Sequence, residues 1–137
     1  YLGFKKAQIQ GLKNIAFLQT DIKHLKRYGL PMVEVIYLLF SDPWPKSRHH
    51  TRRLSSEEFL HIYKDLLKPK GDLIIKTDSQ MLFQYSEEVL ITNRWQIEEQ
   101  DIDFNTPDEE QTAYERKFRQ QQKNIFYIKA RPPRGKA

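Results

Sequence analysis

One loop of the sequence combines a carboxylate, an indole and a run of cations. Asp42 is followed by Trp44, which lies between Pro43 and Pro45. Because proline fixes φ, these residues make a stiff loop, which suits a site that must hold several groups in defined relative positions. The cations and histidines that follow are Lys46, Arg48, His49, His50, Arg52 and Arg53. A stacking surface beside phosphate-binding cations is a combination with which proteins bind RNA, so the loop predicts RNA binding.

Each of these features also has a simpler structural explanation. Asp42 can be a turn carboxylate that backbone amides satisfy, and a run of basic residues can be a solvated surface that binds nothing. The chain has 23 basic and 18 acidic side chains, and its net charge of +5 indicates a polyanionic partner only if the charge is clustered. Lys46, Arg48, Arg52 and Arg53 follow one another without an intervening acid. Most of the net charge can therefore be assigned to this loop.

The loop directly follows residues 33–40, an almost entirely apolar segment. Such a run is typical of a strand that is buried on both faces of a parallel sheet. Ligands of open α/β sheets bind outside the carboxyl ends of the strands, so Asp42 is placed where a ligand should lie. Residues 14–18 predict a preceding strand, and residues 22–28 predict a short helix between the two strands.

The chain continues with helices and strands in alternation. Ser55 and Glu58 form a capping-box pattern, which predicts a helix that residues 68–71 end before a strand at residues 72–76. Ser79 is expected to cap a further helix. The inward face of that helix should consist of Leu82, Phe83, Ser86, Val89 and Leu90.

Two more strands are expected at residues 95–102 and 124–129, and residues 5–12 have the pattern of a helix end. This order predicts a single α/β domain, for which 137 residues suffice. The longest apolar run, residues 35–40, is too short to cross a bilayer, and a composition with 39% hydrophobic residues is not that of a disordered chain. Without cysteine there is no disulfide, thiolate zinc site or cysteine nucleophile, and no residues have metal-ligand spacing.

Residues 40–53 resemble the signature of the bacterial tRNA (guanine-N7)-methyltransferases, which use S-adenosylmethionine to methylate a guanine in the tRNA variable loop. The likeness continues in Lys76-Thr77-Asp78 and in residues 112–118, in the order that the family has. Residues 67–71 are a weaker feature, which many methyltransferases share. The resemblance implies a Rossmann-like class I methyltransferase sheet, mostly parallel with an antiparallel C-terminal strand.

The resemblance covers only the later part of the family's sequence. Methyltransferases of this class begin with a strand and a glycine-rich loop that holds the cofactor, and none of the 5 glycines here has that spacing. We therefore expect residues 1–137 to be the C-terminal portion of a single methyltransferase domain. Its sheet would be incomplete at the N-terminal side, because the first strand and the glycine loop are missing.

The resemblance also implies roles for individual residues. Asp42 matches the position that is assigned as catalytic and that lies at both cofactor and target, and Asp21 matches an acidic residue that binds the adenine amine of S-adenosylmethionine. Asp21 can equally be the N-cap of the helix at residues 22–28. The positions that match substrate-binding residues are Lys46, Asp78, Thr112, Tyr114 and Glu115. The positions that match the RNA-contacting stretch are Arg48, His49, His50, Thr51, Arg52 and Arg53, of which Thr51 stands where relatives often have lysine.

The chemistry of this reaction favours positioning over proton transfer. Guanine N7 has an in-plane lone pair and carries no proton, so its methylation needs no general base. Asp78 and Glu115 can each accept the N1 and N2 hydrogens of guanine, and the sequence does not decide between them. Residues 112–118 can also be an ordinary amphipathic helix in which Glu115 pairs with Arg119.

The partners expected from the resemblance are S-adenosylmethionine and tRNA, in the cytoplasm, with no membrane and no metal. The sequence is compatible with a monomer or a homodimer. Two other functions stay open. One is a catalytically inactive RNA-binding fragment of such an enzyme. The other is a nucleic-acid methyltransferase that acts on amino groups, although the order Asp42-Pro43-Trp44-Pro45 and the arginines after it differ from the loop of those enzymes.

Overall fold

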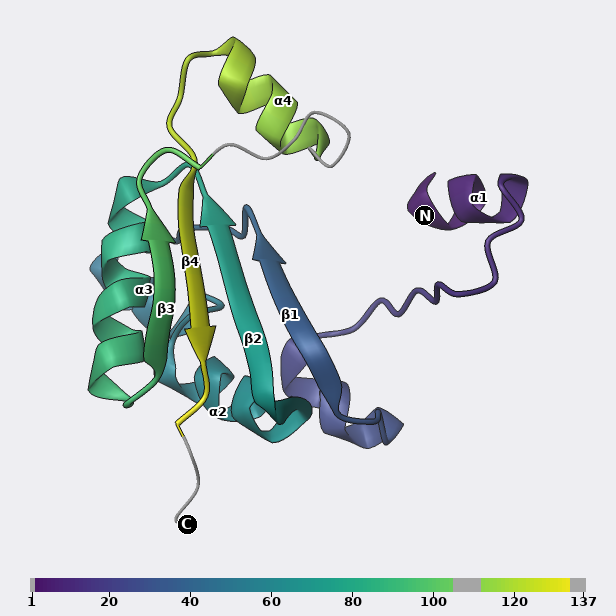
Figure 1. The fold of residues 1–137 in the computed structure, drawn as a ribbon, viewed down its shortest axis with the longest axis horizontal. Helices are drawn as coiled ribbons and strands as arrows, with labels where there is room; N and C mark the ends of the chain where they lie inside the picture. The colour runs from purple at the N-terminus through teal and green to yellow at the C-terminus, as the bar shows by residue number, and fades with distance from the viewer. Residues whose placement is uncertain (1, 105–111, 134–137) are drawn as a thin grey trace.

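The computed structural model describes residues 2–104 and 112–133, and a four-stranded sheet is its centre. The strands lie in the order β1 (Val33–Leu39), β2 (Leu67–Thr77), β4 (Phe126–Arg131) and β3 (Gln96–Asp101). β1 and β2 are parallel, whereas β4 runs antiparallel to both β2 and β3. Figure 1 shows that β1, β2 and β3 point the same way and that β4 alone is reversed. The expected α/β fold, with an antiparallel C-terminal strand, is confirmed.

The helices occupy different positions around this sheet. α2 (Glu57–Leu66) and α3 (Gln80–Thr92) pack on one face, and α4 (Ala113–Gln120) lies at the carboxyl ends of β1 and β2 (Figure 1). α1 (Leu2–Ile9) lies apart from the sheet. Two 3-10 helices, η1 (Ile22–Tyr28) and η2 (Ser47–Arg52), precede β1 and α2. In the described part of the chain, no helix is both long enough and apolar enough to cross a membrane.

The hydrophobic core fills the space between the sheet and the helices α2 and α3. Tyr63 is 1% exposed, and its hydroxyl donates a hydrogen bond to the carbonyl of Leu54 at 2.7 Å. Burial raises the pKa of the Tyr63 hydroxyl, so it stays a donor at neutral pH. The other large members of the core are Leu38, Phe59, Leu60, Leu67, Leu73, Ile75, Phe83, Leu90, Trp95, Phe126 and Ile128.

α3 follows the sequence-based expectation closely. The hydroxyl of Ser79 accepts a hydrogen bond from the amide of Leu82 at 3.1 Å, which caps the helix as predicted. The expected inward face is buried except at its edge, where Val89 is partly exposed. The strands expected at residues 95–102 and 124–129 are also present, as β3 and β4.

Two expectations about strands are wrong. Residues 14–18 form no strand, because no strand of the described chain pairs with them and apolar side chains such as Phe17 stay about half exposed. β1 is a strand, but it is not buried on both faces: Leu38 is buried, whereas Tyr37 and Leu39 are 58% and 41% exposed. The reason is that α2 and α3 cover one face of the sheet only.

The start of α2 and the start of β2 also differ from expectation. The N-cap of α2 is Ser56 and makes no capping bond, because its hydroxyl donates to the carbonyl of Thr51 at 3.1 Å. The hydroxyl of Ser55, the expected cap, bonds that of Ser86 on α3 at 2.6 Å. Residues 68–71 were expected to separate helix from strand, yet β2 begins at Leu67 and includes them as an irregular stretch beside β1.

Neighbouring residues on α3 provide a test of this packing. Leu90 is 0% exposed in the core, whereas Ile91 is 60% exposed on the same helix. Leu90→Ala should lower the free energy of unfolding by about 2–5 kcal/mol, because the substitution removes buried methyl groups and leaves a cavity. Ile91→Ala should change it by about 0.5 kcal/mol or less. Urea unfolding of both variants measures the difference, and equal losses would contradict the placement of α3.

Candidate functional site

The loop of residues 40–53 leaves the carboxyl end of β1, where the sequence places it, and its backbone is unusual. Phe40 and Trp44, which flank Asp42, both have positive φ, at 54° and 44°. The amide of Phe40 donates to the carbonyl of Lys76 at 2.8 Å, which ties the loop to the end of β2. Non-glycine residues with positive φ cost about 1–3 kcal/mol each and persist only where their surroundings impose them. The loop is therefore held in one shape.

Asp42 and Asp21 lie on the same cavity, of about 520 Å³, although separate segments carry them. The Oδ1 atom of Asp42 accepts a bond from the amide of Trp44 at 2.9 Å, so the role as a turn carboxylate is confirmed for this oxygen. The Oδ1 atom of Asp21 likewise accepts from the amide of Lys23 at 2.9 Å and caps η1. The other residues around this cavity are Thr20, Ile22, Lys23, Ser41, Trp44, Arg52, Leu54 and Phe59.

Trp44 is the centre of the exposed basic part of the loop. The guanidinium of Arg52 lies 5.1 Å from the centre of the indole, and the ring of His49 meets the indole edge-on at 5.6 Å. Arg52 is exposed. The other exposed residues of this part are Lys46, Arg48, His50 and Thr51. The structure thus leaves most of the expected RNA-contacting side chains exposed, whereas His49 is partly buried against Trp44.

Arg53 has a different environment from the residue before it. It is 6% exposed, and its Nε atom donates to the carbonyls of Pro43 at 3.0 Å and Trp44 at 3.2 Å. Its Nη2 atom donates to the same Trp44 carbonyl at 3.0 Å. Arg53, which was expected among the RNA-contacting residues, is thus buried, and its Nε and Nη2 donors bind the backbone of the loop that contains Asp42.

A buried ion pair joins the end of β2 to α4. The Nζ atom of Lys76 lies 3.1 Å from Oε1 of Glu115, and these side chains are 11% and 1% exposed. Thr112 caps α4 by accepting a bond from the amide of Glu115 at 3.1 Å. The alternative pairing of Glu115 with Arg119 is wrong, because Arg119 binds the Asp103 carboxylate and the carbonyl of Phe104.

The predicted substrate-binding residues on α4 are thereby placed beside β2. Thr112, Glu115 and Lys76 line one cavity of about 410 Å³. Within the described chain, Oε2 of Glu115 is a buried carboxylate oxygen without a hydrogen-bond partner. Asp78 does not line this cavity, and its carboxylate lies 3.7 Å from the Nζ atom of Lys123. Sequence reasoning did not assign Lys76 a site role, although a lysine at the end of an apolar strand was a usable signal.

Aromatic packing supports the same arrangement. The ring of Phe40 lies 5.3 Å from that of Phe118 and 5.9 Å from that of Tyr114, both on α4. Tyr114 itself is 59% exposed. The residue that begins the Asp42 loop is thus in contact with the helix that carries Glu115.

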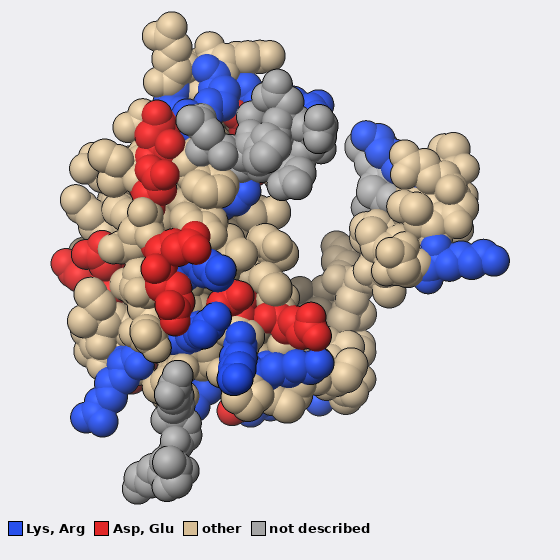
Figure 2. All heavy atoms as spheres, viewed as in Figure 1, with Lys and Arg blue, Asp and Glu red and all other residues tan. Residues whose placement is uncertain are grey.

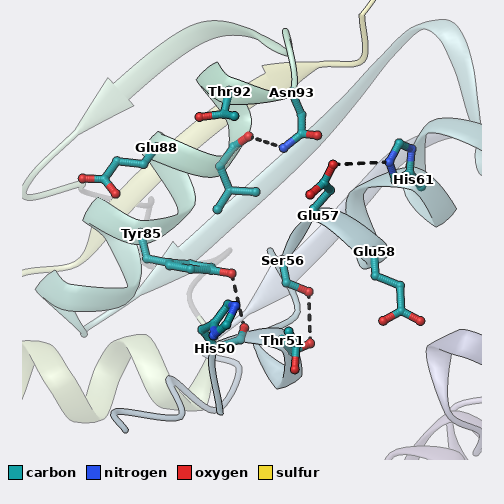
Figure 3. Close-up of a pocket in the computed structure, with 11 residues that line it drawn as sticks. His50, Thr51, Ser56, Glu57, Glu58, His61, Tyr85, Glu88, Thr92 and Asn93 are labelled. Carbon is teal, nitrogen blue, oxygen red and sulfur yellow. Dashed lines mark hydrogen bonds and ion pairs between the residues drawn. The ribbon is translucent and has the colours of Figure 1, made fainter. Parts of the chain in front are cut away.

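A separate cavity, of about 620 Å³, lies between η2, α2 and α3, and His50 and Thr51 of the basic loop line it (Figure 3). Tyr85 donates its hydroxyl proton to the carbonyl of His50 at 3.2 Å inside it. Burial raises the pKa of this hydroxyl, which the Arg53 guanidinium opposes and the Glu57 carboxylate reinforces. Glu57, Glu58 and Glu88 surround the cavity, so it is larger than the cavity at Asp42 but unsuited to a phosphate backbone.

The open face of the sheet carries both acidic and basic side chains. Figure 2 shows acidic and basic groups side by side over it. Lys129 of β4 lies 3.8 Å from a carboxylate oxygen of Glu99, and Arg131 lies 3.3 Å from one of Asp72. These charges compensate one another. In the described part of the chain, no group of three or more His, Asp or Glu residues is placed to hold a metal ion.

The family model and the curated relatives that match this chain are all described as methyltransferases. A family model described as "Putative methyltransferase" matches residues 3–128. The tRNA (guanine-N(7)-)-methyltransferase of Mycoplasma capricolum is 37% identical over 141 residues, covering 93% of this chain and 64% of that protein. The protein of the same name from Mycoplasma mobile is 41% identical over 123 residues, with coverages of 87% and 61%. The chain thus spans about three fifths of the length of the curated relatives it matches.

The structural comparison concerns the fold. An rRNA methylase from Streptococcus thermophilus superposes with a TM-score of 0.60 at 14% sequence identity. The match covers 97% of this chain and 68% of that one. The arrangement of helices and strands described above is therefore one that a methylase has.

The ion pair at the site leads to a stability prediction. Lys76→Met should lower the free energy of unfolding by about 3–5 kcal/mol, because it leaves the buried Glu115 carboxylate without its counter-charge. The double variant Lys76→Met with Glu115→Leu should be more stable than Lys76→Met alone. Denaturant unfolding of the single and double variants measures this coupling.

The exposed pair of Lys26 and Asp65, 2.9 Å apart, provides the matched control. Lys26→Met should cost about 1 kcal/mol or less, since water screens that pair. Strictly additive effects of the Lys76 and Glu115 substitutions would contradict the buried pairing.

Proposed function

Because this chain belongs to the methyltransferase family whose model matches residues 3–128, we propose that the protein transfers a methyl group from S-adenosylmethionine to N7 of a guanine in the tRNA variable loop. The observation that carries the proposal is the meeting of three separate sequence motifs at one end of the sheet. The amide of Phe40 binds the carbonyl of Lys76, and the ammonium of Lys76 binds Glu115. The relatives that are named tRNA (guanine-N(7)-)-methyltransferases support the same substrate.

The residues around Asp42 are chemically suited to the methyl donor. S-adenosylmethionine supplies a methyl group on a positively charged sulfur, and it carries an adenine amine that donates hydrogen bonds. Asp21 and Asp42 line the same cavity, and in each the Oδ1 atom is engaged by a nearby backbone amide. In our proposal Asp21 accepts from the adenine amine, whereas Asp42 lies between the cofactor and the guanine.

Asp42 acts in this proposal through position and charge. The N7 lone pair is free, so no residue has to remove a proton before transfer. Holding the reacting atoms at near-attack distance can lower the barrier by about 7–11 kcal/mol. A fixed carboxylate beside the purine also stabilises the positive charge that develops on the ring. The turn bond from the amide of Trp44 fixes that carboxylate in place.

Glu115 is the better placed of the two carboxylates for reading the guanine edge. Lys76 holds Oε1, so Oε2 is left without a partner in the described chain and can accept a hydrogen from N1 or N2. Thr112 and Lys76 lie on the same cavity, which Asp78 does not line. Adenine has no hydrogen at N1, so this contact would favour guanine.

The exposed part of the loop provides the contacts to the tRNA backbone in this proposal. Arg52 and Trp44 present a guanidinium stacked on an indole, a combination that binds both phosphates and bases. Thr51 is uncharged where relatives often have lysine, so its phosphate contact is weaker. The remaining contacts come from Lys46, Arg48, His49 and His50. A tRNA substrate implies that the protein works in the cytoplasm.

Methyl transfer by the full-length protein tests the proposal directly. Incubation of unmodified tRNA with S-adenosylmethionine labelled in the methyl group should place the label on one guanine of the variable loop, at N7. The matched control is the same tRNA with that guanine replaced by adenine, which should take up no label. Label on an exocyclic amine would instead indicate an amino-methyltransferase. Binding of tRNA without binding of labelled cofactor would indicate an RNA-binding protein without activity.

Substitution of Asp42 separates its charge from its role in the turn. Asp42→Asn keeps an oxygen that can accept from the amide of Trp44, but it removes the negative charge. We expect kcat to fall by about 100-fold or more, as for the loss of other electrostatic groups at a reacting centre, with tRNA affinity nearly unchanged. Asp65→Asn, at an exposed position on α2, is the control. Full turnover by Asp42→Asn would show that Asp42 is a turn residue only.

A further inference from the structure

The two arginines that end the basic loop point in different directions. Arg52 is exposed and stacks on the face of Trp44, where a phosphate can reach its guanidinium. Arg53 is 6% exposed, and three hydrogen bonds from its Nε and Nη2 atoms go to backbone carbonyls of the same loop. The two adjacent arginines therefore differ in what they contact: Arg52 lies at the surface, and Arg53 binds the backbone of the loop.

The carbonyls that Arg53 binds belong to the residues that directly follow Asp42. They are those of Pro43 and Trp44, at 3.0–3.2 Å. Trp44 has a positive φ of 44°, a conformation that the surroundings must impose. Its amide is the donor to Oδ1 of Asp42. Arg53 therefore holds the peptide groups that in turn hold the Asp42 carboxylate.

α3 supports Arg53 from the other side. The guanidinium of Arg53 lies 4.4 Å from the centre of the Tyr85 ring, and the Tyr85 hydroxyl donates to the carbonyl of His50 at 3.2 Å. Figure 3 shows Tyr85 reaching across the cavity to the backbone at His50. A buried hydrogen bond between Ser55 and Ser86, at 2.6 Å, joins the end of the loop to the next residue of α3. The loop is thus fixed to α3 near both Asp42 and the RNA-contacting residues.

We propose that Arg53 is a positioning residue that, together with Tyr85, fixes the conformation of the Asp42 loop against α3 and makes no contact with RNA. For the effect on methyl transfer, the inference rests on the function proposed above. Lysine cannot replace arginine here, because a single ammonium lacks the planar, divided donors that reach two carbonyls and stack on a ring. Arg53 and Tyr85 together link the part of the loop that carries Asp42 to the part that is proposed to bind RNA. Substitution of either residue should therefore affect the placement of Asp42.

The test compares Arg53→Lys with Arg52→Ala in the full-length protein. Arg53→Lys should lower kcat for tRNA methylation by about 10- to 100-fold, because small displacements of reacting groups have effects of this size. Arg53→Lys keeps the positive charge, so the test of RNA contact is Arg53→Gln, which removes it and should leave the slope of log affinity against log salt unchanged. Arg52→Ala should weaken tRNA binding and reduce the slope of log affinity against log salt by about 1, as the loss of one phosphate contact does.

Two further measurements keep the proposal open to refutation. Tyr85→Phe retains the ring beneath the guanidinium but loses the bond to His50, so it should lower kcat in the same direction and by less. Tyr28→Phe, at a half-exposed tyrosine on η1, is its control. Trp95 is 5% exposed, and a Trp44→Phe variant gives the acrylamide quenching of every tryptophan other than Trp44, so the difference from that variant measures Trp44. Quenching should increase in Arg53→Lys and stay constant in Tyr28→Phe.

Each outcome decides between the alternatives. A reduced salt slope in Arg53→Gln would assign Arg53 to RNA contact and overturn the proposal, as would unaltered kcat together with unaltered quenching in Arg53→Lys. If the unsubstituted protein does not methylate tRNA, the proposed function fails by itself. In that case the quenching still decides the positioning role: an increase in Arg53→Lys supports it, and no change overturns it.

Discussion

The buried ion pair of Lys76 and Glu115 is the interaction on which the geometry of the site depends. Removing an ammonium and a carboxylate from water costs several kcal/mol per group, and only close pairing offsets that cost. The two charges meet only when α4 lies against the end of β2. Because Phe40 packs on the same helix, the start of the Asp42 loop is fixed by the same contact. One electrostatic requirement thus places residues that are far apart in the sequence.

The second constraint is the shape of the loop itself. Phe40 and Trp44 have positive φ without being glycines, so the folded state carries a local conformational cost on both sides of Asp42. The surrounding contacts offset this cost, through the amide bond of Phe40 to β2 and the donors of Arg53. A reaction that needs no proton transfer depends mainly on how precisely its groups are held. Rigid support for Asp42 is what such a reaction requires.

The sequence predicts more of the fold than of the detailed site. The helix that Ser79 caps, the strands β3 and β4 and the position of Asp42 after β1 follow from local patterns, and the structure has them. The strand expected at residues 14–18 fails, because a strand needs a partner and the local pattern cannot supply one. Ser55 has the pattern of a cap, yet a nearby hydroxyl on α3 competes for it. Arg53 reads as one more cation in a basic run, and only tertiary packing shows that its donors turn inward.

A site that binds a polyanion beside carboxylates has to separate the two signs of charge. In this loop one carboxylate oxygen of Asp42 accepts from a backbone amide, and the buried Glu115 is paired with Lys76. The exposed cations of the loop are Lys46, Arg48 and Arg52, and Arg52 lies over the ring of Trp44. The acidic groups of Glu57, Glu58 and Glu88 gather at the cavity between η2, α2 and α3. In the function proposed above, phosphates would therefore approach the cations beside Trp44 rather than the acidic cavity. In the proposed function this distribution of charge would help to orient tRNA, and it depends on the loop keeping its conformation.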